Sequence, residues 1–273
     1  MPSLIHNVLA QLSGHIVYKL SRVKVSWFKL LLIKIFIWAN NIDISELLDK
    51  DLKSYSNFND FFIRRLESKY RPIDNKESQI TSPADGTITE FGTVNDGKLI
   101  QAKDHYYDLS DLLGNKLSDQ EIGTDLFLTI YLSPQNYHRI HMPFDGEVIG
   151  AKYIPGEKYT VRPRTLKKVD RVFTKNERLI LWLKSSMGIS PLVMIGALNV
   201  ASISTFWQEE FKFKKDSYSE VPPGKSKKQK GEELACFNLG STVILLLPSS
   251  YAALRVSSMQ PVKMGEAIAE YLP

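Results

Sequence analysis

Residues 236–248, CFNLGSTVILLLP, form an apolar run that follows a Gly-Ser-Thr step and ends at Pro248. The branched residues and the flanking Gly and Pro favour a strand buried on both faces over a segment of a core helix. Two interpretations exist for the start of the run. Gly240 and Ser241 can form a turn in which the hydroxyl bonds nearby backbone groups, or Ser241 can be a nucleophile beside the carbonyl of Gly240. The local pattern alone favours the turn.

Other short runs of branched residues, bounded by Gly, Pro, Asn and Asp, predict a β-rich body around this strand. PADGTI at residues 83–88 is echoed by PFDGEV at residues 143–148, and each places an Asp-Gly turn before a strand. This weak internal repeat predicts two related hairpins. Residues 261–271 predict a last strand–turn–strand unit. Together with that unit, the strands of the body are expected at residues 86–94, 98–102, 126–132, 146–154, 178–184, 192–203 and 242–247.

The N-terminal residues have a different character, with apolar residues at helical spacing and a run, SWFKLLLIKIFIWA, at residues 26–39. Lys29 and Lys34 divide this run into pieces shorter than the ~20 apolar residues of a spanning helix. Tryptophan at both ends and lysines that can reach lipid phosphates favour a helix in the membrane interface over a core helix of a soluble domain. Shorter helices are expected over residues 43–52 and 56–66.

The expected fold class is therefore α+β. A helical, membrane-associating region over residues 1–70 is followed by a β-rich, mainly antiparallel, sandwich- or barrel-like catalytic domain over residues 71–273. The single cysteine, Cys236, excludes a disulfide framework and a cysteine-based zinc site. The net charge of +5 predicts an anionic partner. Because charge and aromatic residues coincide mainly in the N-terminal helix, a membrane surface is favoured and nucleic acid is not expected.

Asp85, His141 and Ser241 form the plausible acid–base–nucleophile set of the chain. His138 and His141 stand three residues apart in YHRIHMP, which also raises a metal site. No motif supplies further metal ligands, so we expect no metal. The G-x-S-x-G frame of α/β-hydrolases is absent around Ser241.

Five motifs then occur in order, and together they resemble the phosphatidylserine decarboxylase proenzymes of the bacterial, membrane-associated type. The resemblance extends from about residue 43 to the C-terminus, whereas the first forty residues are similar only in being apolar and basic. The motifs are FNDFFIR at 58–64, SPADG at 82–86, QAK at 101–103, YHRIHMP at 137–143 and LGST at 239–242.

The resemblance implies that Ser241 attacks the carbonyl of Gly240, with His141 as the base and Asp85 orienting it. Elimination and hydrolysis would release ammonia and separate a large β chain, residues 1–240, from a small α chain, residues 241–273. The small chain would begin with a pyruvoyl group made from Ser241, which forms a Schiff base with the substrate amine. Neither pyridoxal phosphate nor a metal is then expected, and His138 is the expected proton donor.

The resemblance also implies a substrate, phosphatidylserine, a product, phosphatidylethanolamine, and a peripheral place on the cytoplasmic side of the cell membrane, at an anionic phospholipid surface. The oligomeric state stays open, and a homodimer is one of the states considered. Two other functions also stay open. One is a membrane-associated serine hydrolase with an Asp85-His141-Ser241 triad and no self-cleavage. The other is a non-catalytic, β-rich membrane adaptor.

Overall fold

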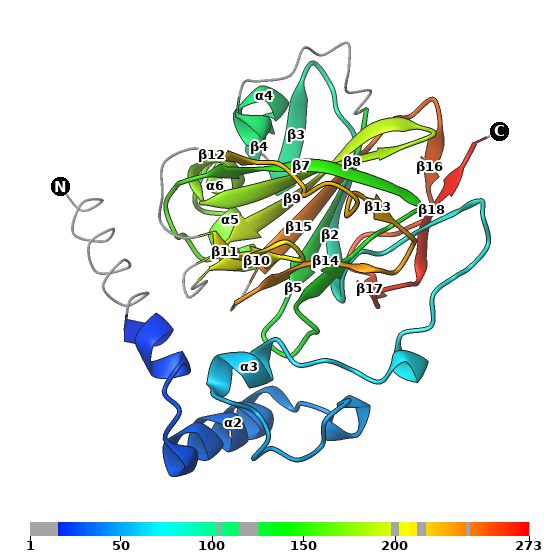
Figure 1. Cartoon of the computed structure of the whole chain (residues 1–273). Helices are drawn as coiled ribbons and strands as arrows, with labels where there is room; N and C mark the ends of the chain where they lie inside the picture. Colours follow the sequence, from blue (N-terminus) through cyan, green and yellow to red (C-terminus); the bar gives the residue numbers. More distant parts are fainter. Residues whose placement is uncertain are drawn as a thin grey trace.

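The computed structural model describes residues 16–102, 105–114, 125–197, 202–211, 217–238 and 241–272. Helical segments from the N-terminal part lie together on one side of a β-rich body (Figure 1). They are α2 (Ser26–Asn40), η1 (Ile44–Glu46), α3 (Phe58–Phe62) and η2 (Ser68–Tyr70), and they precede the first strand, β1 (Gln79–Thr81). The predicted α+β class is confirmed.

Helix α2 carries apolar residues on all sides, and only part of it is covered. Ile33 is buried, and Phe36 packs against Phe58 of α3 with ring centroids 5.2 Å apart. The ε-ammonium of Lys29 donates to the carbonyl oxygens of Lys53, at 2.9 Å, and of Tyr55. Lys29 therefore faces the protein, and the prediction that it reaches lipid phosphates is wrong. Among the helices in the described ranges, none has the length and apolarity to cross a bilayer.

The predicted helix over residues 43–52 shrinks to the single turn of η1. The carboxylate of Asp43 accepts from Ser45 N at 2.8 Å, as a helix cap does. Farther along, the side chain of Asp49 accepts from Asp51 N at 3.1 Å and that of Asp51 accepts from Lys53 N at 2.9 Å. These local side-chain bonds satisfy backbone groups that a helix would use, which explains why no longer helix forms.

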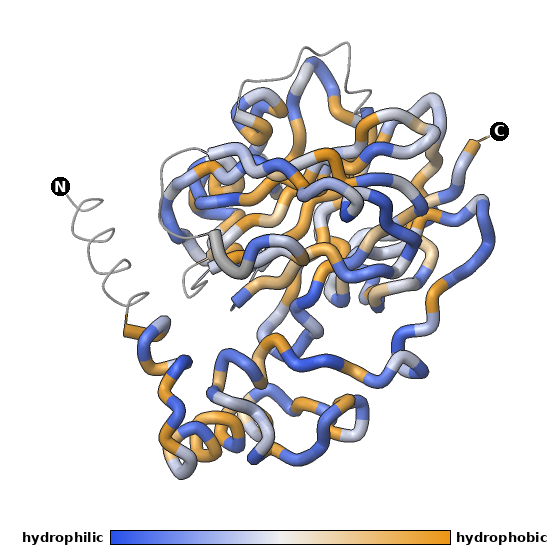
Figure 2. The backbone as a smooth tube through the Cα atoms, in the orientation of Figure 1, coloured by the Kyte–Doolittle hydropathy of each residue, from blue (hydrophilic) through white to orange (hydrophobic). Residues whose placement is uncertain are grey.

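The centre of the body is a nine-stranded sheet, and the run from Ser241 to Leu247 is one of its middle strands, β15. All its residues are buried, so the predicted doubly covered strand is confirmed. The apolar colouring of Figure 2 gathers in these central strands. The sheet runs β12 (Ser217–Ser219), β7 (Gly146–Ile154), β8 (Arg178–Ser185), β9 (Gly188–Gly196), β15 (Ser241–Leu247), β5 (Leu126–Leu132), β2 (Gly86–Thr93) and β17 (Pro261–Val262), with β13 (Lys227–Lys228) beside β7.

Three smaller sheets and three short helices complete the described body. Every pairing between its named strands is antiparallel, as predicted, but within the described residues each sheet stays open, so the barrel-like form is not found. The sheets are β1, β18 (Ala267–Tyr271) and β16 (Ala252–Leu254); β11 (Gln208–Phe211), β10 (Ile203–Thr205), β14 (Glu233–Phe237) and β6 (Arg139–His141); and β3 (Lys98–Ala102) with β4 (His105–Asp108). The helices are α4 (Leu109–Leu113), α5 (Pro163–Leu166) and α6 (Val172–Lys175).

The internal repeat predicted from the two P-x-D-G segments is present, but it does not form hairpins. Strand β1 pairs with β18, whereas β2 pairs with β5 and β17. Likewise, β6 pairs with β14, whereas β7 pairs with β8 and β13. Each Asp-Gly bend is thus a corner that leads the chain from one sheet into another. We call residues 81–88 with 260–267 the first corner, and residues 141–148 with 226–233 the second corner.

The two corners also contact each other in a reciprocal way. Thr81 N donates to Pro143 O at 2.8 Å, and His141 N donates to Pro83 O at 2.8 Å. The donor stands two residues before the proline in both corners. An exchange of equivalent bonds is what two copies of one motif make when they meet around an approximate two-fold axis.

Candidate active site

Ser241 begins β15 at one end of the large sheet. Its backbone pairs with Leu132 of β5 and Gly196 of β9. The residue is 1% exposed, and within the described ranges its Oγ has no hydrogen-bond partner. Buried hydroxyls nearly always have a partner, so an uncommitted one calls for an explanation. Gly240, on the other side of the predicted cleavage bond, lies outside the described residues.

Asp85 lies at the same end of the sheet, directly before β2. Thr87 of β2 and Thr242 of β15 both pair with Tyr131 of the strand between them, β5. Neighbouring strands are ~4.8 Å apart, which puts the backbones of Thr87 and Thr242 ~10 Å apart. The first corner therefore places Asp85 two strands away from Ser241.

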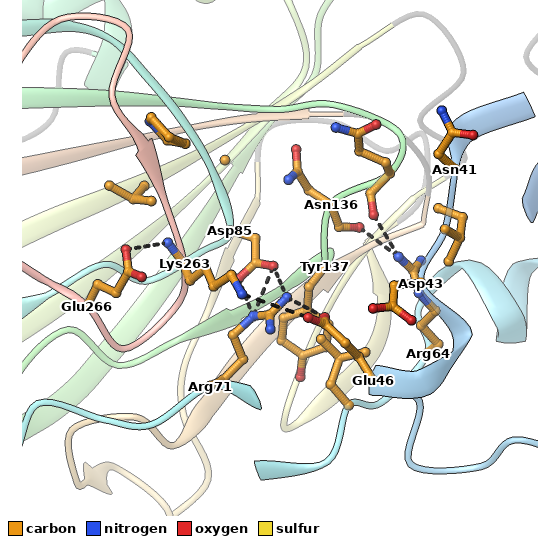
Figure 3. A pocket seen from close by; sticks show the side chains of 16 residues that line it. Asn41, Asp43, Glu46, Arg64, Arg71, Asp85, Asn136, Tyr137, Lys263 and Glu266 are labelled. Atoms are coloured by element: carbon orange, nitrogen blue, oxygen red, sulfur yellow. Dashed lines mark hydrogen bonds and ion pairs between the residues drawn. The ribbon is translucent and has the colours of Figure 1, made fainter. Parts of the chain in front are cut away.

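The carboxylate of Asp85 is buried, and Arg71 binds both of its oxygens (Figure 3). Arg71 Nε donates to Oδ1 at 2.8 Å, and Nη2 donates to Oδ2 at 2.5 Å. Met264 N also donates to Oδ1, at 2.9 Å. The same Nη2 of Arg71 donates to Glu46 at 3.0 Å. A two-pronged guanidinium contact of this kind fixes the orientation of a carboxylate.

His141, at the end of β6, is 8% exposed. Its Nδ1 lies 2.7 Å from the carbonyl oxygen of Gly231, and since a carbonyl only accepts, Nδ1 carries the proton. Its Nε2 then accepts from the hydroxyl of Tyr137 at 3.1 Å. Burial lowers the pKa of His141 and outweighs the opposing effect of the bond to Gly231, which favours a neutral ring. Among the described residues, no hydrogen bond joins His141 to Asp85.

His138 is fully buried beside the same site, with its ring centroid 4.2 Å from that of Phe62 in α3. Its Nδ1 donates to Asn136 O at 2.8 Å, while Nε2 has no partner within the described residues. Burial, assisted by the positive charge of Arg64, lowers the pKa of His138 to about 3, against a small opposing effect of the bond to Asn136. The ring is therefore a neutral acceptor at Nε2, and donation from this atom requires that it first gain a proton.

A cavity of about 540 Å³ opens beside Asp85, between the helical region and the first corner (Figure 3). Arg64 forms part of its wall and is 4% exposed. Its Nη2 donates to the carbonyls of Gln135, at 2.8 Å, and Asn136, at 3.4 Å. Burial lowers the pKa of Arg64 to about 10, so its guanidinium still carries its charge at neutral pH. The cavity thus combines a buried cation with the carboxylate of Asp85.

Comparison with known proteins shows the family to which this chain is related. A family model described as phosphatidylserine decarboxylase matches residues 58–270. A phosphatidylserine decarboxylase proenzyme of Saccharophagus degradans is 37% identical over 97% of this chain and 93% of its own length. Another, from Legionella pneumophila, is 43% identical over 82% of this chain and 80% of its own length. The chain belongs to the phosphatidylserine decarboxylase family.

Membership of the phosphatidylserine decarboxylase family confirms the resemblance that the five motifs indicated. The structure also brings to the site three residues that sequence reasoning missed. Arg64 and Tyr137 stand inside two of the quoted motifs, so those motifs held a usable signal. Arg71 stands outside them, and only the fold brings it to Asp85.

Proposed function

We propose that this chain is the precursor of an enzyme that decarboxylates phosphatidylserine to phosphatidylethanolamine. The family match over residues 58–270 is the observation that carries the proposal, and relatives that align with most of the chain support it. A decarboxylase is favoured over a serine hydrolase or a membrane adaptor because the relatives have this activity in their names.

In the proposed precursor, Ser241 attacks the carbonyl carbon of Gly240, and the peptide bond becomes an ester. The buried Oγ of Ser241 suits this role because it has no hydrogen-bond partner among the described residues that would have to be released first. The hydroxyl proton passes to His141, whose Nε2 is unprotonated. For this transfer the hydroxyl of Tyr137 must turn away from Nε2. Asp85 supplies the negative charge that favours the protonated imidazole.

β-Elimination of the ester would release the carboxylate of Gly240 as the C-terminus of a large chain, 1–240, and leave dehydroalanine at position 241. Hydrolysis would then release the nitrogen of residue 241 as ammonia, so that the small chain begins with a pyruvoyl group. A pyruvoyl group supplies an electron-withdrawing carbonyl, the chemistry for which other decarboxylases bind a separate cofactor. The surroundings of Ser241 fit such a group, because β5 and β9 hold its backbone on both sides and its side chain has no competing partner within the described ranges. His138, whose Nε2 has no partner in the described part of the chain, is the proposed proton carrier for the decarboxylation.

The exposed face of α2 supports a place at a membrane surface. Trp27, Leu31, Ile35 and Trp38 recur at helical spacing and are 70%, 48%, 52% and 81% exposed. Large apolar side chains in a contiguous exposed stripe favour burial against lipid. We propose peripheral association with the cytoplasmic side of the cell membrane, at an anionic lipid surface, through this face.

The decisive experiment is an intact-mass measurement of the purified chain under denaturing conditions, together with a decarboxylation assay on phosphatidylserine vesicles. We expect two polypeptides, of which the smaller begins at position 241 with a carbonyl in place of the amine. The Ser241→Ala variant should remain one inactive chain. A full-length chain that decarboxylates phosphatidylserine would contradict the self-cleavage.

A further inference from the structure

Arg71 adds to the first corner a contact that the second corner lacks. Asp85 accepts from Met264 N at 2.9 Å, and the equivalent Asp145 accepts from Lys230 N at 2.7 Å. Since both aspartates bind an amide from the second segment of their corner, this bond closes the corner. In the described part of the chain, Asp145 has no guanidinium partner. The contact with Arg71 therefore serves something other than the folding of the corner.

The geometry of Arg71 shows how strongly it is held. Its Nε and Nη2 bind the two oxygens of Asp85, its Nη2 also binds Glu46 at 3.0 Å, and its Nη1 donates to Tyr70 O at 2.7 Å. Arg71 is 8% exposed and Asp85 is 3% exposed. Each nitrogen of the guanidinium thus has an acceptor, and the pair is shielded from solvent. Burying a carboxylate is unfavourable unless a cation or several donors compensate its charge.

We propose that Arg71 is a positioning residue for self-cleavage. It holds the side chain of Asp85 as a charged acceptor in one orientation, so that the carboxylate can stabilise His141 when that ring takes the proton of Ser241. The proposal rests on the proposed function. Arg71 acts through Asp85, and within the described residues its guanidinium bonds only Asp85, Glu46 and Tyr70, not Ser241.

Glu46 extends this contact to the helical region. It lies in η1, between α2 and α3, and its Oε2 binds Arg71 while its Oε1 lies 3.8 Å from Lys263 Nζ. The position of Arg71 is therefore determined from both sides of the cavity. Loss of the Glu46 charge weakens one of the bonds to Arg71 and leaves the contact with Asp85, so its effect should be smaller.

The test is a time course of self-cleavage. The full chain is made by cell-free synthesis with a short radioactive pulse, and the conversion of precursor into two bands is followed on denaturing gels. We expect Arg71→Gln to slow conversion on the order of ten- to a hundredfold, as displaced catalytic groups do. Arg71→Lys should restore part of the rate because it returns the charge without the two-pronged contact. Glu46→Gln should have the smaller effect.

Two further variants separate positioning from folding. Arg255→Gln removes a guanidinium that contacts Glu270 at 3.1 Å on the surface, and it should convert at the unaltered rate. Arg71→Ala leaves a space where millimolar guanidinium ions can bind, and their addition should accelerate conversion. A merely structural role predicts no such acceleration.

The outcomes distinguish this inference from the proposed function. If the unaltered chain converts and Arg71→Gln converts equally fast, the role of Arg71 is overturned and the decarboxylase proposal stands. If Arg71→Lys is as slow as Arg71→Gln and guanidinium has no effect, Arg71 is structural and the inference is again overturned. An unaltered chain that never converts overturns both.

Discussion

The two corners of the β body have the same backbone and different chemistry. Each has a P-x-D-G bend, an aspartate that accepts an amide N–H, and a bulge two to four residues after the glycine, between Ile88 and Glu90 in one corner and Val148 and Gly150 in the other. Yet the first corner supplies the proposed catalytic carboxylate and the second supplies the proposed base. His141 stands where the first corner has Thr81. A duplicated motif can thus contribute two different groups to one site when each copy varies at a different position.

The largest effect should come from replacing Asp85 with asparagine, and the same replacement at Asp145 provides the comparison. Asp85→Asn should slow self-cleavage on the order of a thousandfold or more, because an uncharged amide cannot stabilise a protonated His141. Asp145→Asn should leave the cleavage rate within about threefold and lower the free energy of unfolding by about 1 kcal/mol, the scale of one hydrogen bond. Pulse-labelled gels and denaturant unfolding measure the two effects. Equal cleavage rates in the two variants would remove the functional distinction between the corners.

The next effect concerns two glycines that occupy the same position in the second segments of the two corners. Gly265 and Gly231 adopt φ of +92° and +84°, values that side chains strain, and both lie against Ile73. Alanine at either position should lower the free energy of unfolding by about 1–3 kcal/mol. Gly265→Ala should be the worse, because its Cβ would lie 2.6 Å from the backbone oxygen of Pro72, whereas at position 231 it meets the side chain of Ile73.

Only one of these glycines touches the base. The carbonyl of Gly231 accepts from His141, so Gly231→Ala should also slow self-cleavage, and more than Gly265→Ala, which reaches the set only through its neighbour Met264. Unfolding is best measured in the Ser241→Ala background, where the chain stays whole. Faster cleavage in Gly231→Ala than in Gly265→Ala would contradict this contrast.

A further effect, on stability alone, is a dependence of the free energy of unfolding on pH. His138, three residues before the second corner, is fully buried with a pKa of about 3. Ser78, at the same place before the first corner, is exposed and does not titrate. The unfolded chain binds a proton at His138 below about pH 6.5 and the folded chain does not, so acid favours unfolding. His138 should therefore lower the free energy of unfolding by up to about 1.4 kcal/mol per pH unit as the pH falls from about 6 toward 4.

Replacing the ring tests this assignment. His138→Gln in the Ser241→Ala background should show a shallower slope of unfolding free energy against pH over the same range. A slope unchanged by the substitution would mean that His138 is not the group responsible. Ser78→Gln provides the control, because it should leave the slope as it is.

Sequence reasoning located most long strands well because their signal is local, but the strand expected over 192–203 is β9, which begins at Gly188 and ends at Gly196. Continuous branched residues between turn formers predicted β5, β7 and β15 almost to the residue. The helix expected over 43–52 failed because Asp49 and Asp51 bind backbone groups next to them, a competition that a cap-like pattern does not reveal.

The candidate residues that lie in motifs could be predicted from the sequence. The contacts that only the fold creates could not. Asp85, His141 and Ser241 were named from the sequence. The structure places the backbones of Asp85 and Ser241 at one end of the large sheet, and it joins His141 N, in β6 of another sheet, to Pro83 O beside Asp85. The bond from Asp85 to Arg71 joins residues 14 positions apart through no regular element, so no periodicity could indicate it. The second segments of the corners share little beyond Gly-Glu at 231–232 and 265–266, which hid the extent of the repeat.

The pairing of β15, β17 and β18 determines how the two products of cleavage would be held. After a break between residues 240 and 241, β15 would still lie between β5 and β9, β17 beside β2, and β18 beside β1. Each of these partners belongs to the other fragment. The break would thus be a nick in an interwoven body, and the two products should copurify until a denaturant separates them. Neither fragment holds the complete sheet, so mixing separately made fragments should not readily rebuild the enzyme.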